Sequence, residues 1–161
     1  MRPTAERVRE ATFAALGSLG AIEGAAVLDL FAGSGALGVE ALSRGAERAT
    51  FVDDDPAAVG AIERNVEAAG VADRATIVEA SAERFCGEHA GDAYDLAFLD
   101  PPYAFDEWAH LLAVVPAGTV VIESDREVEV GEPSVVLRQK RYGGTVVAIV
   151  RRPDDSARRQ R

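Results

Sequence analysis

The chain has 161 residues, 48% of them hydrophobic, enough for one globular domain with a core, and no stretch approaches the roughly 18 consecutive apolar residues of a membrane span. One cysteine and two histidines exclude an internal disulfide and a cysteine zinc cluster, so we expect no metal. The formal charge of −10 argues against a protein that binds nucleic acid over its whole surface. The first residues lack the apolar segment of a signal peptide, so we expect a cytoplasmic protein without membrane contacts.

Short β-branched runs alternate with helical stretches along the chain, which is typical of an α/β domain. Thr4 is placed to cap a first helix that ends near Gly20, because apolar residues recur there at helical spacing. The alternation predicts a doubly wound, mostly parallel sheet. Its strands are expected at residues 27–31, 49–52, 75–78, 96–99 and 119–123, and its helices at residues 36–43, 56–69, 82–89 and 107–114.

The last part of the chain departs from this alternation. Residues 134–141 and 145–151 are both rich in β-branched or long side chains and are separated by Tyr142-Gly143-Gly144. A short glycine-containing connection of this kind is typical of a hairpin. We therefore expect an antiparallel pair at the C-terminal end of an otherwise parallel sheet.

Basic residues gather in the same region. Arg138, Lys140 and Arg141 lie in the first strand of the predicted hairpin, and the last eleven residues contain five arginines against two aspartates. This distribution leaves room for a local basic face on an acidic chain. We expect residues 1–152 to form the domain and residues 153–161 to be a basic, disordered tail.

The loop between the first predicted strand and the following helix is rich in glycine. Gly33, Gly35 and Gly38 match the pattern G-x-G-x-x-G of nucleotide-binding turns. Glycine is favoured here because the chain turns sharply and a ligand approaches the backbone closely. The pattern is weak by itself, and a tight strand-to-helix turn without a ligand stays open as an alternative.

Acidic residues near this loop favour one kind of ligand. Asp29 precedes the glycines in the strand, where a carboxylate disfavours a pyrophosphate and suits a cationic ligand. S-adenosylmethionine carries an amino group and a sulfonium but no phosphate, so we expect it as the cofactor. Asp53, with Asp54 beside it, follows the second strand where a carboxylate accepts ribose hydroxyls. Asp55, before Pro56, is expected to cap the next helix.

The third predicted strand leads into Ser81 and Ala82. If the first two assignments hold, the adenine ring lies against these residues. The alternative is that Ser81 only caps the next helix, and one residue can do both.

The sequence Asp100-Pro101-Pro102-Tyr103 directly follows the fourth predicted strand. Strands one and four flank the point where the strand order reverses, and ligands bind there in open α/β sheets. The prolines hold the chain extended, which leaves the Pro101 carbonyl and the Asp100 carboxylate as two acceptors for the exocyclic amine of a base. Tyr103 is expected to stack on a base held outside its helix. The alternative is a rigid turn with a buried tyrosine.

The combination of these motifs resembles the RsmD family of 16S ribosomal RNA guanine-N2 methyltransferases. The resemblance covers nearly the whole chain, and its specificity rests on the combination, since DNA adenine methyltransferases share the glycine loop and the D-P-P-Y sequence. The matching segments are residues 2–4, 7–10, 29–38, 40–46 and 100–103, with Phe13, Glu123 and Ser124.

The resemblance implies a class I, Rossmann-like fold that depends on S-adenosylmethionine. It implies transfer of a methyl group to the N2 of a guanine in 16S ribosomal RNA, with S-adenosylhomocysteine as the product and the 30S subunit as the partner. Phe31, Gly33 and Gly35 would border the methionine part of the cofactor. The predicted cofactor site comprises Asp29, Phe31, Ala32, Gly33, Gly35, Asp53, Asp54, Ser81 and Ala82, and the predicted catalytic group comprises Asp100, Pro101, Pro102 and Tyr103.

Family members usually carry a short basic segment before the Arg-Pro-Thr sequence, whereas this chain begins at Met1, so we expect RNA docking to be its weakest property. Three alternatives stay open. A DNA N6-adenine methyltransferase uses the same motifs but normally needs a base-recognition domain. A protein or small-molecule methyltransferase agrees with the acidic charge, but its substrate would give Tyr103 no obvious base to stack on. A binding module without catalysis would not need its glycines or Asp100.

Overall fold

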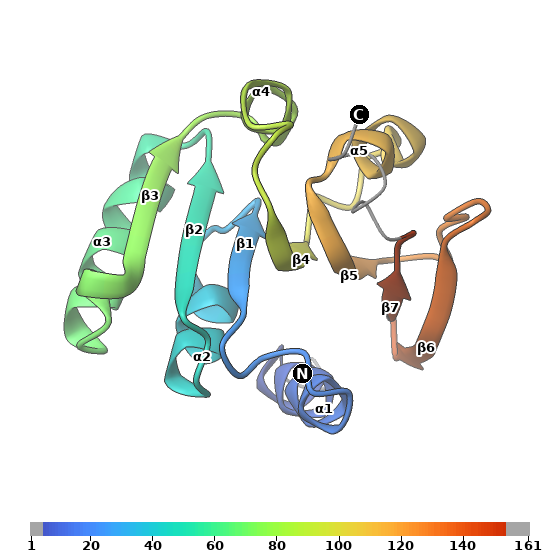
Figure 1. Ribbon diagram of the computed structural model, residues 1–161, viewed down its shortest axis with the longest axis horizontal. Helices are drawn as coiled ribbons and strands as arrows, with labels where there is room; N and C mark the ends of the chain where they lie inside the picture. Colours follow the sequence, from blue (N-terminus) through green and yellow to red (C-terminus); the bar gives the residue numbers. More distant parts are fainter. Residues whose placement is uncertain (1–4, 154–161) are drawn as a thin grey trace.

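The buried apolar runs of the sequence form the strands of one sheet. Residues 5–153, which the computed structural model describes, fold into a seven-stranded sheet with the order β3-β2-β1-β4-β5-β7-β6 (Figure 1). The strands are β1 (Ala26–Leu30), β2 (Arg48–Asp53), β3 (Ala75–Glu79), β4 (Tyr94–Leu99), β5 (Ala117–Ser124), β6 (Val135–Tyr142) and β7 (Thr145–Arg151). The helices are α1 (Ala5–Ser18), α2 (Ala36–Ser43), α3 (Pro56–Ala68), α4 (Ala82–Glu88) and α5 (Trp108–Val114), with a short 3-10 helix η1 (Ala72–Arg74).

The pairing of the strands confirms the predicted fold class. The pairs among β1 to β5 are parallel, whereas β7 runs antiparallel to both β5 and β6. The hairpin predicted from Tyr142-Gly143-Gly144 is therefore present. Its return strand β7 lies inside the sheet and β6 forms the edge, an order that the hairpin pattern did not predict.

The central strands read as continuous apolar runs because helices cover both faces of the sheet. Successive residues of a strand point to opposite faces, so Phe98 packs in one core cluster and Leu99 in the other. The first cluster contains residues of α1, α2 and α3, including Phe13, and the second contains residues of α4 and α5, including Leu111. The carboxyl ends of β1 to β5 consequently meet at one edge, where the candidate site lies.

The first strand is shorter than its apolar run predicts. The apolar run predicts a first strand that includes Phe31, but β1 ends at Leu30 because Phe31 has φ 56 and leaves the extended conformation. The proposed cap Thr4, the Arg-Pro-Thr sequence and residues 154–161 of the predicted tail lie outside the described residues. Within the described part, no helix is long and apolar enough to cross a membrane.

Candidate active site

Each glycine of the loop between β1 and α2 has its own reason to be glycine. Gly33 and Gly35 have φ values of 58 and 80, in the left-handed region that favours glycine, and Gly35 begins α2 as its N-cap. Gly38 is required by packing, because a Cβ there would lie 2.3 Å from Cε1 of Phe51. The loop therefore turns sharply and lets α2 approach β2 closely, as the pattern indicated.

Side chains from neighbouring elements hold this loop in place. The Gly33 N–H donates to Oδ2 of Asp53 at 2.8 Å, and Nδ2 of Asn65 in α3 donates to the carbonyl of Ser34 at 2.8 Å. Oδ1 of Asp53 accepts the N–H of Asp55 at 2.9 Å. Each Asp53 oxygen keeps a second lone pair, so the carboxylate can still accept hydrogen bonds from a ligand. Asp55 caps α3 through Ala57, as predicted.

Asp29 lies in β1 ahead of the glycines, as predicted, and its carboxyl group is buried. Its side chain is 1% exposed, lies beneath the loop, and accepts the Gly38 N–H at 3.0 Å. Its pKa is raised to about 8, mainly by burial and also by the charges of Asp100 and Asp53, while the Gly38 hydrogen bond opposes the shift. Asp29 therefore supports the start of α2, and its carboxyl group lines neither of the two pockets described below.

The raised pKa of Asp29 makes a prediction for folding. The ordinary pKa is 3.8 and the folded value is about 8, so folding takes up a proton between these values. The stabilising contribution is full below about pH 4 and is lost as the pH rises to about 8, by up to about 1.4 kcal/mol per pH unit. Asp29→Asn cannot ionise, so urea unfolding should show it gaining stability relative to the wild type between pH 6 and pH 8. An equal difference at both pH values would contradict this.

A pocket of about 270 Å³ opens at the carboxyl ends of β1, β2 and β3. It brings together the predicted residues Phe31, Asp53, Asp54, Ser81 and Ala82. Sequence reasoning missed four further residues that line it, namely Val52, Ala80, Glu83 and Phe105.

Phe105 is the most informative of the missed residues. It follows the D-P-P-Y sequence in a turn in which its N–H donates to the Pro102 carbonyl at 2.9 Å. Its ring meets that of Phe31 edge to face, with centroids 5.6 Å apart. The loop after β4 thus forms one wall of a pocket whose other walls come from β1, β2 and β3. Ser81, in addition to lining this pocket, caps α4 by accepting the Arg84 N–H at 3.1 Å.

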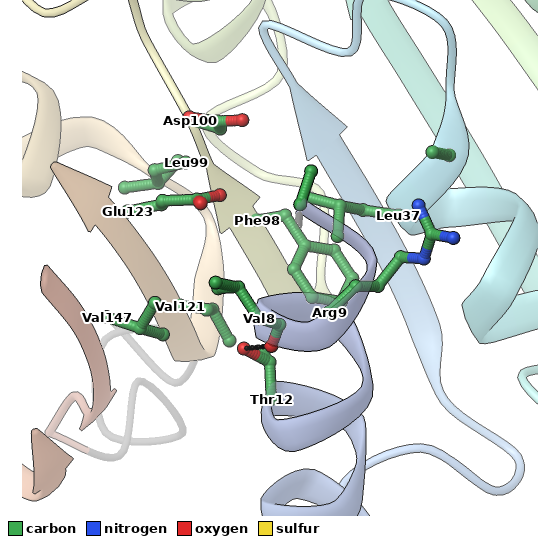
Figure 2. A pocket seen from close by; sticks show the side chains of 12 residues that line it. Val8, Arg9, Thr12, Leu37, Phe98, Leu99, Asp100, Val121, Glu123 and Val147 are labelled. Atoms are coloured by element: carbon green, nitrogen blue, oxygen red, sulfur yellow. Dashed lines mark hydrogen bonds between the residues drawn. The ribbon is translucent and has the colours of Figure 1, made fainter. Parts of the chain in front are cut away.

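A second cavity, of about 140 Å³, lies beside Asp100 (Figure 2). Asp100 follows β4 and Glu123 lies in β5, and the register that pairs Leu99 with Ile122 places the two carboxyl groups opposite each other. Helix α1 closes the cavity on one side, with Val8 and Arg9 in its lining. The sequence indicates Glu123 as a site residue only through the family resemblance. Asp100, its neighbour in the fold, is 23 residues away in the chain.

The two carboxyl groups form a coupled pair. The pKa of Glu123 is raised to about 7, mainly by burial and also by the charge and hydrogen bond of Asp100. Burial also raises the pKa of Asp100, but the hydrogen bond with Glu123 lowers it. Burial thus raises the pKa of both carboxyl groups, and their hydrogen bond favours the proton on Glu123. Arg9, in the same lining, pairs with Glu40 at 3.8 Å.

The residues that follow Asp100 differ in their exposure to solvent. Pro101 is buried, whereas Pro102 is exposed and the Tyr103 side chain is 60% exposed. The alternative of a rigid turn around a buried tyrosine is therefore wrong. An exposed aromatic ring next to a carboxylate and a cavity offers a flat apolar surface to a planar group arriving from solvent.

Known proteins share both the sequence and the fold. Residues 1–151 match the family model described as Conserved hypothetical protein 95. The chain is 38% identical over 142 residues to the ribosomal RNA small subunit methyltransferase D of Escherichia coli K12, covering 84% of this chain and 69% of the relative. The protein of the same name from Haemophilus influenzae is 29% identical over 154 residues, covering 89% and 79%. A hypothetical protein of Thermus thermophilus has a solved structure with a TM-score of 0.79 and 34% identity, covering 94% of this chain and 88% of that one.

Proposed function

The chain belongs to the Conserved hypothetical protein 95 family, which is the RsmD family of methyltransferases, and we propose that it methylates the N2 of a guanine in 16S ribosomal RNA. One observation carries the proposal. Asp100 follows Leu99 at the end of β4, Leu99 pairs with Leu30 at the end of β1, and the next residue of that strand's loop, Phe31, lines the pocket, while Tyr103 is exposed three residues after Asp100. A base amine and a methyl donor can meet at this point of the sheet.

The pocket at the ends of β1, β2 and β3 fits S-adenosylmethionine, which is the cofactor. Asp53 has acceptor capacity for the ribose hydroxyls, and the apolar surfaces of Phe31, Phe105 and Ala82 suit the adenine ring. Gly33 and Gly35 let the methionine part approach the loop backbone. When bound, the cofactor supplies an electrophilic methyl group on a sulfonium. The carboxylates of Asp53 and Asp100 give this edge of the sheet the negative potential that a cation needs.

Asp100, Pro101 and Tyr103 hold the target base in this proposal. The Asp100 carboxylate and the Pro101 carbonyl accept the two N–H groups of the guanine amine, and Tyr103 stacks on the ring. Positioning of the amine for in-line transfer is the main contribution, and no covalent enzyme intermediate is needed. Cys86 is buried and outside both pockets, in agreement with a packing role.

Phe105→Ala tests the cofactor pocket. Removing this wall should raise the Kd for S-adenosylmethionine about tenfold, because full burial of an apolar side chain of this size contributes about 1.5–3 kcal/mol and the complex loses part of that contribution. Tyr103→Ala is the matched control, since it changes an aromatic residue of the same loop that does not line this pocket. Calorimetry should show normal cofactor affinity for Tyr103→Ala and weakened affinity for Phe105→Ala. Equal affinities would remove Phe105 from the site.

The proposed substrate is tested by transfer of a labelled methyl group. The protein is incubated with labelled S-adenosylmethionine and one of three substrates, which are 30S subunits lacking the modification, naked 16S RNA, or DNA. We expect label on a guanine of 16S RNA. The 30S particle should be the preferred substrate, because a folded particle already presents the base and a small enzyme then needs fewer contacts of its own. Label only on DNA adenine would overturn the proposal.

A further inference from the structure

Positive charge is concentrated in one stretch of this acidic chain. The whole sequence contains 27 acidic and 17 basic residues, yet residues 133–153 contain five basic residues and no acidic one. This stretch forms the hairpin of β6 and β7. The only lysine of the chain, Lys140, lies in it.

The basic side chains of β6 are not neutralised within the described part of the protein. Arg138, Lys140 and Arg141 are exposed, and no described carboxylate lies within ion-pair distance of them. Lys140 instead places Nζ 5.4 Å from the ring centre of Tyr142. Basic residues elsewhere do pair with carboxylates, as seen for Arg9, Arg44, Arg84 and Arg126. Binding of an anion to β6 therefore breaks no ion pair among the described residues.

The register of the sheet places this charge beside the candidate active site. Lys140 pairs with Val147 of β7, and Val147 pairs with Glu123 of β5, which lies opposite Asp100. Lys140 is thus level with the two carboxyl groups along the strands. Three strand spacings of about 4.8 Å separate β4 from β6, which gives roughly 14 Å. Figure 1 shows β6 as the outer strand of this half of the sheet.

Two of the basic residues share the face on which the Asp100 cavity opens. Val147 lines that cavity and Ile149 packs with α1, and these residues pair with Lys140 and Arg138. Tyr142 packs against the same core cluster. Paired residues point to the same face of a sheet, so Arg138, Lys140 and Tyr142 form one row, which we call the β6 strip.

We propose that the β6 strip binds the phosphate backbone of the substrate RNA beside the nucleotide whose base reaches Asp100. This inference rests on the proposed function. An RNA helix presents several phosphates over the distance from β4 to β6, since a nucleic-acid duplex holds about one per 1.7 Å of axis. Arginine and lysine supply the charge, and Tyr142 adds an aromatic surface for an unpaired base. The β6 strip lets a protein with an acidic net charge bind RNA next to the cavity beside Asp100.

Binding of 30S subunits lacking the modification tests the strip directly. For the double variant Arg138→Gln/Lys140→Gln, we expect the Kd for the particle to rise about tenfold at physiological salt. The slope of log Kd against log salt should fall by roughly 2, about one for each phosphate that the variant no longer neutralises. The Kd for S-adenosylmethionine should stay unchanged.

Two control substitutions distinguish an effect of the β6 strip from an effect of the net charge of the protein. Arg48→Gln/Arg64→Gln removes the same charge from exposed residues at the start of β2 and on α3, and should leave the salt slope unchanged. Arg141→Gln changes the neighbour of Lys140 that points to the opposite face, and should have a smaller effect than Lys140→Gln. If Lys140→Gln and Arg141→Gln have equal effects, the assignment of RNA binding to the face of the sheet covered by α1 is overturned.

The outcomes also distinguish the strip from the proposed function. If the wild type transfers label to 16S RNA while the Arg138/Lys140 variant keeps its Kd and salt slope, the strip is wrong and the function stands. If the wild type transfers no label to any RNA, the function fails. If 30S binding is unchanged and the variant alters sedimentation of the protein alone, β6 is a contact between copies of the chain and the proposal is overturned.

Discussion

Replacing Asp100 by alanine is expected to lower kcat for methyl transfer about 10³-fold while S-adenosylmethionine still binds. Removal of one preorganised hydrogen-bonding group at a reacting centre typically costs about 10²–10³-fold. Asp100 lines the cavity beside Tyr103 and does not line the proposed cofactor pocket. Single-turnover transfer to 30S subunits, at saturating labelled cofactor, measures the loss.

Asp100→Asn is the matched variant for this experiment. It keeps the size of the side chain and one acceptor oxygen but removes the charge, so its activity should fall between those of the wild type and Asp100→Ala. Calorimetry on the same preparations should show cofactor affinity within a small factor of the wild type. Full activity in Asp100→Ala would rule out the proposed role of this carboxylate.

Glu123→Ala is expected to lower kcat about 10²-fold, although Glu123 is not proposed to touch the base. Its carboxyl group shares a hydrogen bond with that of Asp100, and both lie at the ends of adjacent parallel strands. Losing this partner lets Asp100 move, and a misplacement of about 1 Å can cost about 10²-fold. Glu123 is therefore proposed as a positioning residue. Glu123→Gln keeps a donor for Asp100 and should restore most of the activity.

The pH profile separates positioning by Glu123 from a general packing effect. Glu123 holds its proton below a pKa of about 7, so the hydrogen bond is present at lower pH and is lost as the pH rises through that value. Arg9, on α1, and the buried Asp29, on β1, are the other charged groups near this pair. We expect kcat/KM of the wild type to fall above about pH 7, with an apparent pKa that belongs to the pair. The profile of Glu123→Gln should be flat there, and a profile like that of the wild type would contradict the proposal.

The glycine loop and the D-P-P-Y sequence are recognisable from the chain because their requirements are local. A left-handed φ at Gly33 and Gly35 and two consecutive prolines after a strand are properties of a few adjacent residues. The exposure of Tyr103 agrees with the stacking surface expected for it. The same locality explains one error, since the apolar character of Phe31 predicts a strand residue although its backbone turns.

The sequence by itself determined the order of strands and helices, the cap at Asp55 and the two chemical motifs, since hydrophobic period and turn chemistry act over short distances. Only the tertiary structure decided which distant residues meet. It buried Asp29 under the loop, brought Glu123 to Asp100, and placed Lys140 level with both. The physical reason is that sheet order and register bring together residues far apart in the chain, and the burial created by that packing changes their charge.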